Sequence, residues 1–96
     1  MEILGGRRSR IELVASILKA AIQAERKTRI IHKSNLDTRI ARSLLPALEE
    51  LGLIERNEAT RHQVYRVTAK GLEFLKHYEN IVRLLRLDAY RRKHVP

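Results

Sequence analysis

Hydrophobic and polar residues divide the segment 38–51 into two faces. At 100° per residue, apolar side chains gather on one side and polar side chains on the other. The apolar face is formed by Ile40, Ala41, Leu44, Leu45, Ala47, Leu48 and Leu51. The polar face is formed by Thr38, Arg39, Arg42, Ser43, Pro46, Glu49 and Glu50. This pattern predicts an amphipathic helix that packs through one face and presents the other to a partner.

Capping residues mark the boundaries of this helix and of a shorter helix before it. Asp37 is a good N-cap for the helix at 38–51, and Gly52 can adopt the left-handed conformation that follows its end. We expect Thr28 to cap the shorter helix, and Asn35, in the turn between the helices, to hold a positive φ. Two helices joined by so short a turn predict a helix-turn-helix.

Pro46 lies in the middle of the polar face of the segment 38–51. Proline has no amide donor, so the carbonyl of Arg42 loses its helical hydrogen bond. Water can satisfy that carbonyl on an exposed face. We therefore expect a modest kink, which turns Glu49 and Glu50 away from the surface formed by the N-terminal turns.

The flanking segments complete a predicted α+β, mostly helical fold. Ser9 and Glu12 form a capping box that opens a first helix, expected to run to about Glu25. Apolar and polar residues around a polar loop predict a β-hairpin, or wing, over about residues 53–67. A hairpin behind a helix-turn-helix predicts a winged helix-turn-helix domain over residues 9–67.

A long last helix follows, with Thr68 as its expected N-cap and residues 68–92 as its extent. Its apolar positions recur at spacings of three and four. They are Phe74, Leu75, Tyr78, Ile81, Val82, Leu85 and Ala89. We expect this stripe to form a homodimer through a coiled coil, because one small domain cannot bury it. The alternative is that the helix folds back along the first helix within one chain. Residues 93–96 form a tail.

Two runs of residues carry a resemblance to a known family. The runs are SNLDTRIARSLLPALEELGLIE at 34–55 and YRVTAKGLEFL at 65–75. Together they resemble archaeal winged helix-turn-helix DNA-binding proteins, in particular the ten-kilodalton chromosomal proteins of Sulfolobus, over about residues 9–92. The resemblance implies DNA binding through the helix at 38–51 and dimerisation through the last helix, with antiparallel pairing.

The charge of the chain adds independent support for a polyanionic partner. Lys and Arg number 20 against 11 Asp and Glu, which gives a formal net charge of +9 and a pI near 10.7. Residues 1–42 carry ten basic and four acidic side chains, whereas residues 43–96 carry ten and seven. The half that contains the helix-turn-helix is therefore the more positive one.

We expect double-stranded DNA to be the partner. The candidate DNA-binding residues are Arg7, Arg8, Lys27, Thr28, Arg29, Lys33, Thr38, Arg39, Arg42, Ser43, Arg56, Arg61 and His62. Arg7 and Arg8 lie in a segment, residues 1–8, that we expect to be a flexible basic arm after Gly5-Gly6. This arm either contacts DNA or is a solvated leader. The few aromatic residues favour duplex DNA over single strands, which are bound by stacking.

Other chemistry is not expected. The chain has no cysteine, its four histidines are scattered, and it contains no phosphate-binding loop. Glu73 and His77 share a helix face, but two ligands do not complete a metal site. We therefore expect no enzymatic activity, cofactor or metal. No apolar run approaches a membrane span of about 20 residues, so we expect a cytoplasmic, nucleoid-associated protein.

Three functional hypotheses remain open. The first is a dimeric transcriptional regulator that inserts the helix at 38–51 into the major groove, with Arg39, Arg42 and Ser43 facing base edges. The second is a chromosomal architectural protein that binds mainly phosphates with little sequence preference. The third is a winged helix that serves as a protein–protein interaction module, because a fold does not determine a function.

Overall fold

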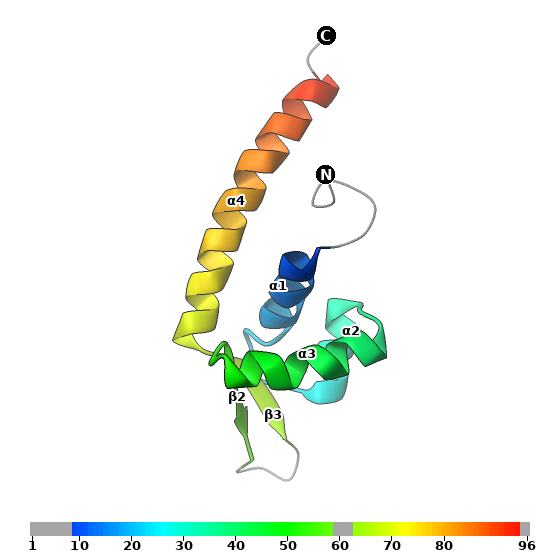
Figure 1. Ribbon diagram of the computed structural model, residues 1–96, viewed down its shortest axis with the longest axis vertical. Coiled ribbons are helices and arrows are strands. Elements are labelled where there is room, and N and C mark those ends of the chain that lie inside the picture. Colours follow the sequence, from blue (N-terminus) through cyan, green and yellow to red (C-terminus); the bar gives the residue numbers. More distant parts are fainter. Residues whose placement is uncertain (1–8, 59–62, 95–96) are drawn as a thin grey trace.

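The predicted order of three helices, a hairpin and a long last helix is confirmed, with one additional short strand. The computed structural model describes residues 9–58 and 63–94, and the side chains of 9–58 and 63–85. Its elements are α1 (Arg10–Ala20), β1 (Glu25–Arg26), α2 (Lys27–Ser34), α3 (Thr38–Glu50), β2 (Ile54–Asn57), β3 (Val64–Val67) and α4 (Ala69–His94), as Figure 1 shows. The fold is a mostly helical α+β fold.

The β2–β3 hairpin belongs to a three-stranded antiparallel sheet in the order β1-β3-β2. The strand β1 corrects the expectation that the first helix continues to about Glu25. That helix ends at Ala20, because the chain turns there to meet β3: the amide of Val67 donates to the carbonyl of Ala21 at 2.9 Å, and Glu25 pairs with Tyr65.

The hydrophobic core lies between α1, α2, α3 and the sheet. Its largest fully buried side chains are Ile17, Leu18, Ile30, Leu45, Leu48 and Ile54. The last helix adds Leu75, which is 7 % exposed. This packing holds α3 across the front of the body with one side facing outward (Figure 1).

The buried face of α3 is narrower than expected. Its buried members are Ala41, Leu44, Leu45 and Leu48. The sequence pattern also assigned Ile40, Ala47 and Leu51 to this face, but all three are exposed, Ile40 by 43 % and Leu51 by 56 %. These residues lie on one margin of the buried stripe, about 70° to 110° from its centre at 100° per residue. The neighbouring elements do not extend far enough to cover that margin.

The start of α2 also differs from the prediction. Arg26, and not Thr28, is the N-cap, with the extended angles φ −71° and ψ 155°. Because Arg26 pairs with Val64 in the sheet, it is the last residue held outside the helix. The turn after α2 is as predicted: Asn35 adopts the left-handed conformation with φ 54°.

The last helix rises beside α1 and extends beyond it (Figure 1). Its predicted cap is confirmed, because the hydroxyl oxygen of Thr68 accepts a hydrogen bond from the amide of Gly71 at 3.1 Å. Lys19 on α1 forms an ion pair with Glu79 at 2.8 Å, and its ammonium lies 5.5 Å from the ring centre of Tyr78. The first turns of α4 therefore fold back along α1 within one chain, which is the arrangement of the alternative hypothesis.

The apolar stripe on α4 is divided by this packing. The members in or against the core are Phe74, Leu75 and Tyr78. The members that remain partly or largely accessible are Ile81, Val82 and Leu85. Ala89 lies beyond the side chains that the structure describes. The apolar side chains of this stripe that the body leaves accessible therefore lie on the later turns of the helix, where Leu84 is also 64 % exposed.

Candidate nucleic-acid interface

Both ends of α3 are fixed by hydrogen bonds to its terminal backbone groups. At the start, the side chain of Asp37 accepts a hydrogen bond from the amide of Arg39 at 2.8 Å, as predicted for an N-cap. At the end, Gly52 takes a φ of 78° and its amide bonds the carbonyl of Glu49 at 3.0 Å, while Leu53 bonds Leu48 at 2.9 Å. This pair of bonds is a Schellman motif. The helix therefore holds a defined position and register on the body.

The N-terminal turns of α3 present two cations that have little internal compensation. The side chain of Arg39 is 94 % exposed, and its nearest counter-ion is Asp37 at 3.8 Å. Arg42 is exposed and has no hydrogen-bond or ion-pair partner within the described part of the chain. Thr38 and Ser43 are exposed beside them. These turns can donate hydrogen bonds and carry two positive charges toward a partner.

The candidate cations on α2 have a different environment. Glu25 on β1 accepts a hydrogen bond from the Lys33 ammonium at 3.1 Å and lies 3.7 Å from the Arg29 guanidinium. The hydrogen bond from Lys33 and the charges of Lys33 and Arg29 hold the pKa of the Glu25 carboxyl below its ordinary value. One carboxylate thus offsets part of the positive charge of two predicted DNA contacts.

The start of α2 supplies the remaining candidates on this helix. Lys27 and Thr28 are its first two residues, and both are exposed. Their backbone amides are among those that have no partner within a helix, and they coincide with the positive end of the helix dipole. The start of α2 can therefore meet a phosphate without help from Lys33 or Arg29.

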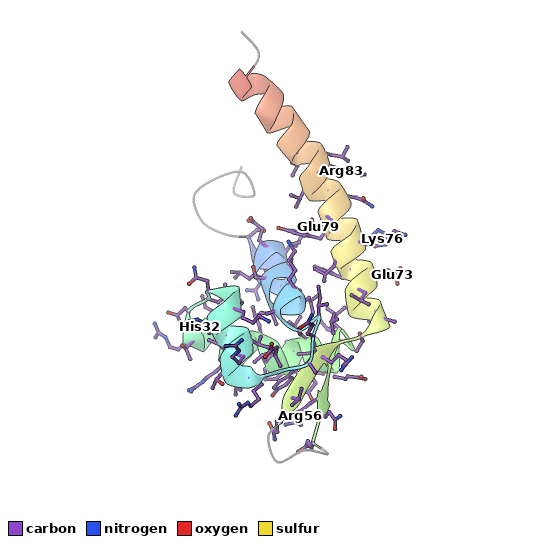
Figure 2. All side chains as sticks on the ribbon, turned by 180° about the vertical axis from the view of Figure 1, so that it is seen from behind. His32, Arg56, Glu73, Lys76, Glu79 and Arg83 are labelled. Carbon is purple, nitrogen blue, oxygen red and sulfur yellow. The ribbon has the colours of Figure 1, made fainter. Side chains whose placement is uncertain are left out.

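The wing contributes Arg56, which is tied to α3 by an ion pair with Glu49 at 3.3 Å. Figure 2 shows Arg56 on the hairpin and His32 on the outer side of α2, well apart from each other. The predicted contacts Arg61 and His62 at the tip of the wing, and Arg7 and Arg8 in the arm, lie outside the described residues.

One part of the surface was not recognised from the sequence. An open cleft between the start of α1 and α3 is lined by Arg10, Leu13, Ile40, Ser43 and Leu44. The sequence pattern assigned Ile40 to the apolar face, and Arg10 was not among the candidate DNA-binding residues. The signal available from the sequence was weak, because Ile40 lies at the boundary between the two faces of the helix.

The described residues contain no group of three or more His, Cys, Asp or Glu side chains placed to hold a metal ion. Glu73 and His77 form a surface pair on α4 at 3.7 Å. None of the helices, as far as they are described, has the length and apolar character needed to cross a membrane.

Comparisons with known proteins agree with this arrangement. A family model described as winged helix-turn-helix matches residues 7–86. No curated protein matches the chain. Similar solved structures include Sso10a-2, a DNA-binding protein from Sulfolobus solfataricus, with a TM-score of 0.75 and 23 % identity over 90 % of each chain. AF1382 from Archaeoglobus fulgidus has a TM-score of 0.66 and 17 % identity over 88 % of this chain and 94 % of that one.

A bacterial structure with DNA also shares the fold. ZitR from Lactococcus lactis, solved in complex with DNA, has a TM-score of 0.57 and 21 % identity over 88 % of this chain and 66 % of that one. The expected resemblance to winged helix-turn-helix proteins of Sulfolobus is confirmed at the level of the fold. At these identities the structural likenesses establish a shared fold.

Proposed function

The chain belongs to the winged helix-turn-helix family, and from this premise we propose that it binds double-stranded DNA as a dimeric transcriptional regulator. In this proposal α3 enters the major groove with Arg39, Arg42 and Ser43 toward the base edges. The observation that carries the proposal is the pair of weakly compensated arginines on the N-terminal turns of α3. In this proposal the protein acts in the nucleoid and catalyses no reaction.

Two further observations support duplex binding. The chain has a net charge of +9, which favours association with a polyanion. The similar structures include one named as a DNA-binding protein, Sso10a-2, and one solved with DNA, ZitR. Phosphate contacts in the proposal come from Lys27 and Thr28. Smaller contributions come from Arg29 and Lys33, whose charge is partly offset by Glu25, and from Arg56, whose charge is partly offset by Glu49. The predicted contacts in the arm and the wing tip, Arg7, Arg8, Arg61 and His62, remain part of the proposal.

The proposed dimer forms through the later turns of α4. This helix has 26 residues, or about 39 Å at 1.5 Å per residue, and extends past the body (Figure 1). Ile81 and Leu84 are exposed by 51 % and 64 %, with Val82 and Leu85 partly exposed beside them. Burial of these side chains against a second copy would remove an apolar surface from water.

The proposal is tested by fluorescence anisotropy with a random-sequence duplex and with the region upstream of the protein's own gene, across a salt series. A regulator prefers the upstream region strongly. Equal affinity for both duplexes with a steep salt dependence would instead identify the architectural alternative. Absence of binding to any duplex at low salt would reject DNA binding and favour the protein–protein module.

A matched pair of variants locates the binding surface. Arg39→Ala with Arg42→Ala removes two charges from α3. Lys76→Ala with Arg83→Ala removes two exposed charges from α4, away from α3 (Figure 2). The proposal requires the first pair to weaken binding far more than the second. Equal losses of affinity would show that the chain binds duplexes through its overall charge alone.

A further inference from the structure

We propose that Ile40 recognises thymine, by packing its side chain against C5-methyl groups in the major groove. This inference rests on the proposed insertion of α3 into duplex DNA. It assigns part of the base recognition to an apolar side chain that makes no hydrogen bond. A protein built this way favours A·T pairs even where its arginines contact only phosphates.

The position of Ile40 is the first observation. It is the third residue of α3, in the turns that recognition helices bring closest to base edges. The residue is 43 % exposed, although isoleucine is among the residues most often buried. The adjacent Ala41 is fully buried, so the backbone is held against the core while Ile40 stays at the surface.

Two cations near Ile40 are the second observation. Arg39 precedes it in the chain and is 94 % exposed on its side chain. Arg10 of α1 lines the same cleft as Ile40 and Ser43. A polyanion that contacts both Arg39 and Arg10 would lie close to Ile40 and Ser43. An apolar side chain close to two cations fits the major groove, where methyl groups lie between two rows of phosphates.

The chemistry of the groove selects thymine. Among the four bases, only thymine displays a methyl group in the major groove, and side chains contact it through apolar atoms. Isoleucine is stiff at χ1, so it loses little rotamer freedom when it packs. Burying one methyl group is worth about 0.8 kcal/mol, or about fourfold in affinity.

The experiment compares duplexes that differ only in this methyl group. An alternating A·T duplex is measured against the same duplex with uracil in place of thymine. In a second pair, 5-methylcytosine replaces cytosine in an alternating G·C duplex, which adds the methyl group at the equivalent carbon. Binding of the full chain is followed by fluorescence anisotropy at low salt. The variants are Ile40→Ala, the conservative Ile40→Val, and Ile22→Ala, an isoleucine of similar exposure (49 %) beside α4.

The wild-type chain is expected to bind the methylated member of each pair about fourfold more tightly. Ile40→Ala should remove this preference, Ile40→Val should keep part of it, and Ile22→Ala should leave it unchanged. Equal affinity of the wild-type chain for thymine and uracil duplexes would overturn the inference while leaving duplex binding intact. A preference that survives Ile40→Ala would overturn it too. Failure to bind any duplex would overturn the proposed function and this inference together.

Discussion

A β-carbon placed on Gly71 would lie 2.3 Å from the carbonyl oxygen of Leu53 and 2.5 Å from Cγ2 of Val67. The first turn of α4 therefore rests directly on the backbone that enters the wing. The same carbonyl of Leu53 accepts the amide of Thr68 at 3.0 Å, and the Thr68 hydroxyl donates to the carbonyl of Gly52 at 2.6 Å. This joint links the end of α3, the wing and α4.

Gly71→Ala is expected to lower the free energy of unfolding by about 1–3 kcal/mol, although alanine is the better helix former. The reason is that a backbone oxygen cannot move aside as a flexible side chain can. Urea denaturation followed by circular dichroism measures the decrease in stability. Gly52 provides the contrast. Its surroundings are open, so replacing it by alanine is unfavourable only because of its φ of 78°. At position 52, asparagine tolerates that conformation and should destabilise the protein less than alanine does. At position 71, asparagine should have no such advantage over alanine.

The two candidate cation pairs are expected to differ in their effect on duplex affinity. Replacing Arg39 and Arg42 with alanine should cost about 1–3 kcal/mol for each arginine that reaches a base edge. Replacing Arg29 and Lys33 should cost less, because Glu25 offsets part of their charge. Anisotropy titrations at one low salt concentration rank the two double variants.

Glu25→Gln supplies the control for that ranking. It releases Lys33 and Arg29 from their counter-ion, so duplex affinity at low salt should rise, and the alanine replacement of both cations should then cost more than it does in the wild-type chain. If Glu25→Gln leaves both quantities unchanged, the two cations do not approach the duplex.

The stability of the fold is also expected to depend on pH through the carboxyl of Glu25. Because the hydrogen bond from Lys33 lowers its pKa, the carboxylate stabilises the fold fully above its ordinary value of 4.5. This contribution is lost as the pH falls through the lowered pKa. The thermal midpoint of Glu25→Gln should lie below that of the wild-type chain near neutral pH, and the two should converge below pH 4.5. A difference that stays constant with pH would contradict the ion-pair interpretation.

Dimerisation is expected to depend on the later turns of α4. Ile81→Glu with Leu84→Glu introduces charge into the proposed interface and should give a monomer of unchanged circular dichroism. Leu72→Glu is the matched control, because Leu72 is 49 % exposed on the same helix but lies beside the body. Size-exclusion chromatography with light scattering measures the masses. A wild-type chain that already runs as a monomer at high concentration would remove the dimer from the proposal.

Local chemistry was sufficient to predict the boundaries set by single side chains. Ser9 with Glu12, Asp37, and Thr68 all form the expected capping bonds, because each involves groups only two or three residues apart. Asn35 and Gly52 take the positive φ values expected of them. The physical cause of each feature lies within one turn of the chain, so the sequence contains it.

Features set by distant parts of the chain were not predictable in the same way. The end of α1 is determined by pairing of Glu25 and Arg26 with β3, and nothing near these two residues indicates a strand. The exposure of Ile40 depends on how far α1 reaches along α3, and the burial of Leu75 on how closely α4 packs against the body. Periodicity identifies which residues share a face but not which neighbour covers it.

Because α4 is continuous, its length sets how the two DNA-binding surfaces are rotated relative to each other in any dimer built on it. One continuous helix carries both the contacts to α1 and the later apolar turns, so a change in its length between them would rotate the body relative to those turns. Each residue added between them would move the partner by only 1.5 Å but turn it by about 100°. The relative orientation of two recognition helices is thus far more sensitive to helix length than their separation. An insertion of about seven residues, close to two full turns, would return each body to nearly its original orientation about the helix axis.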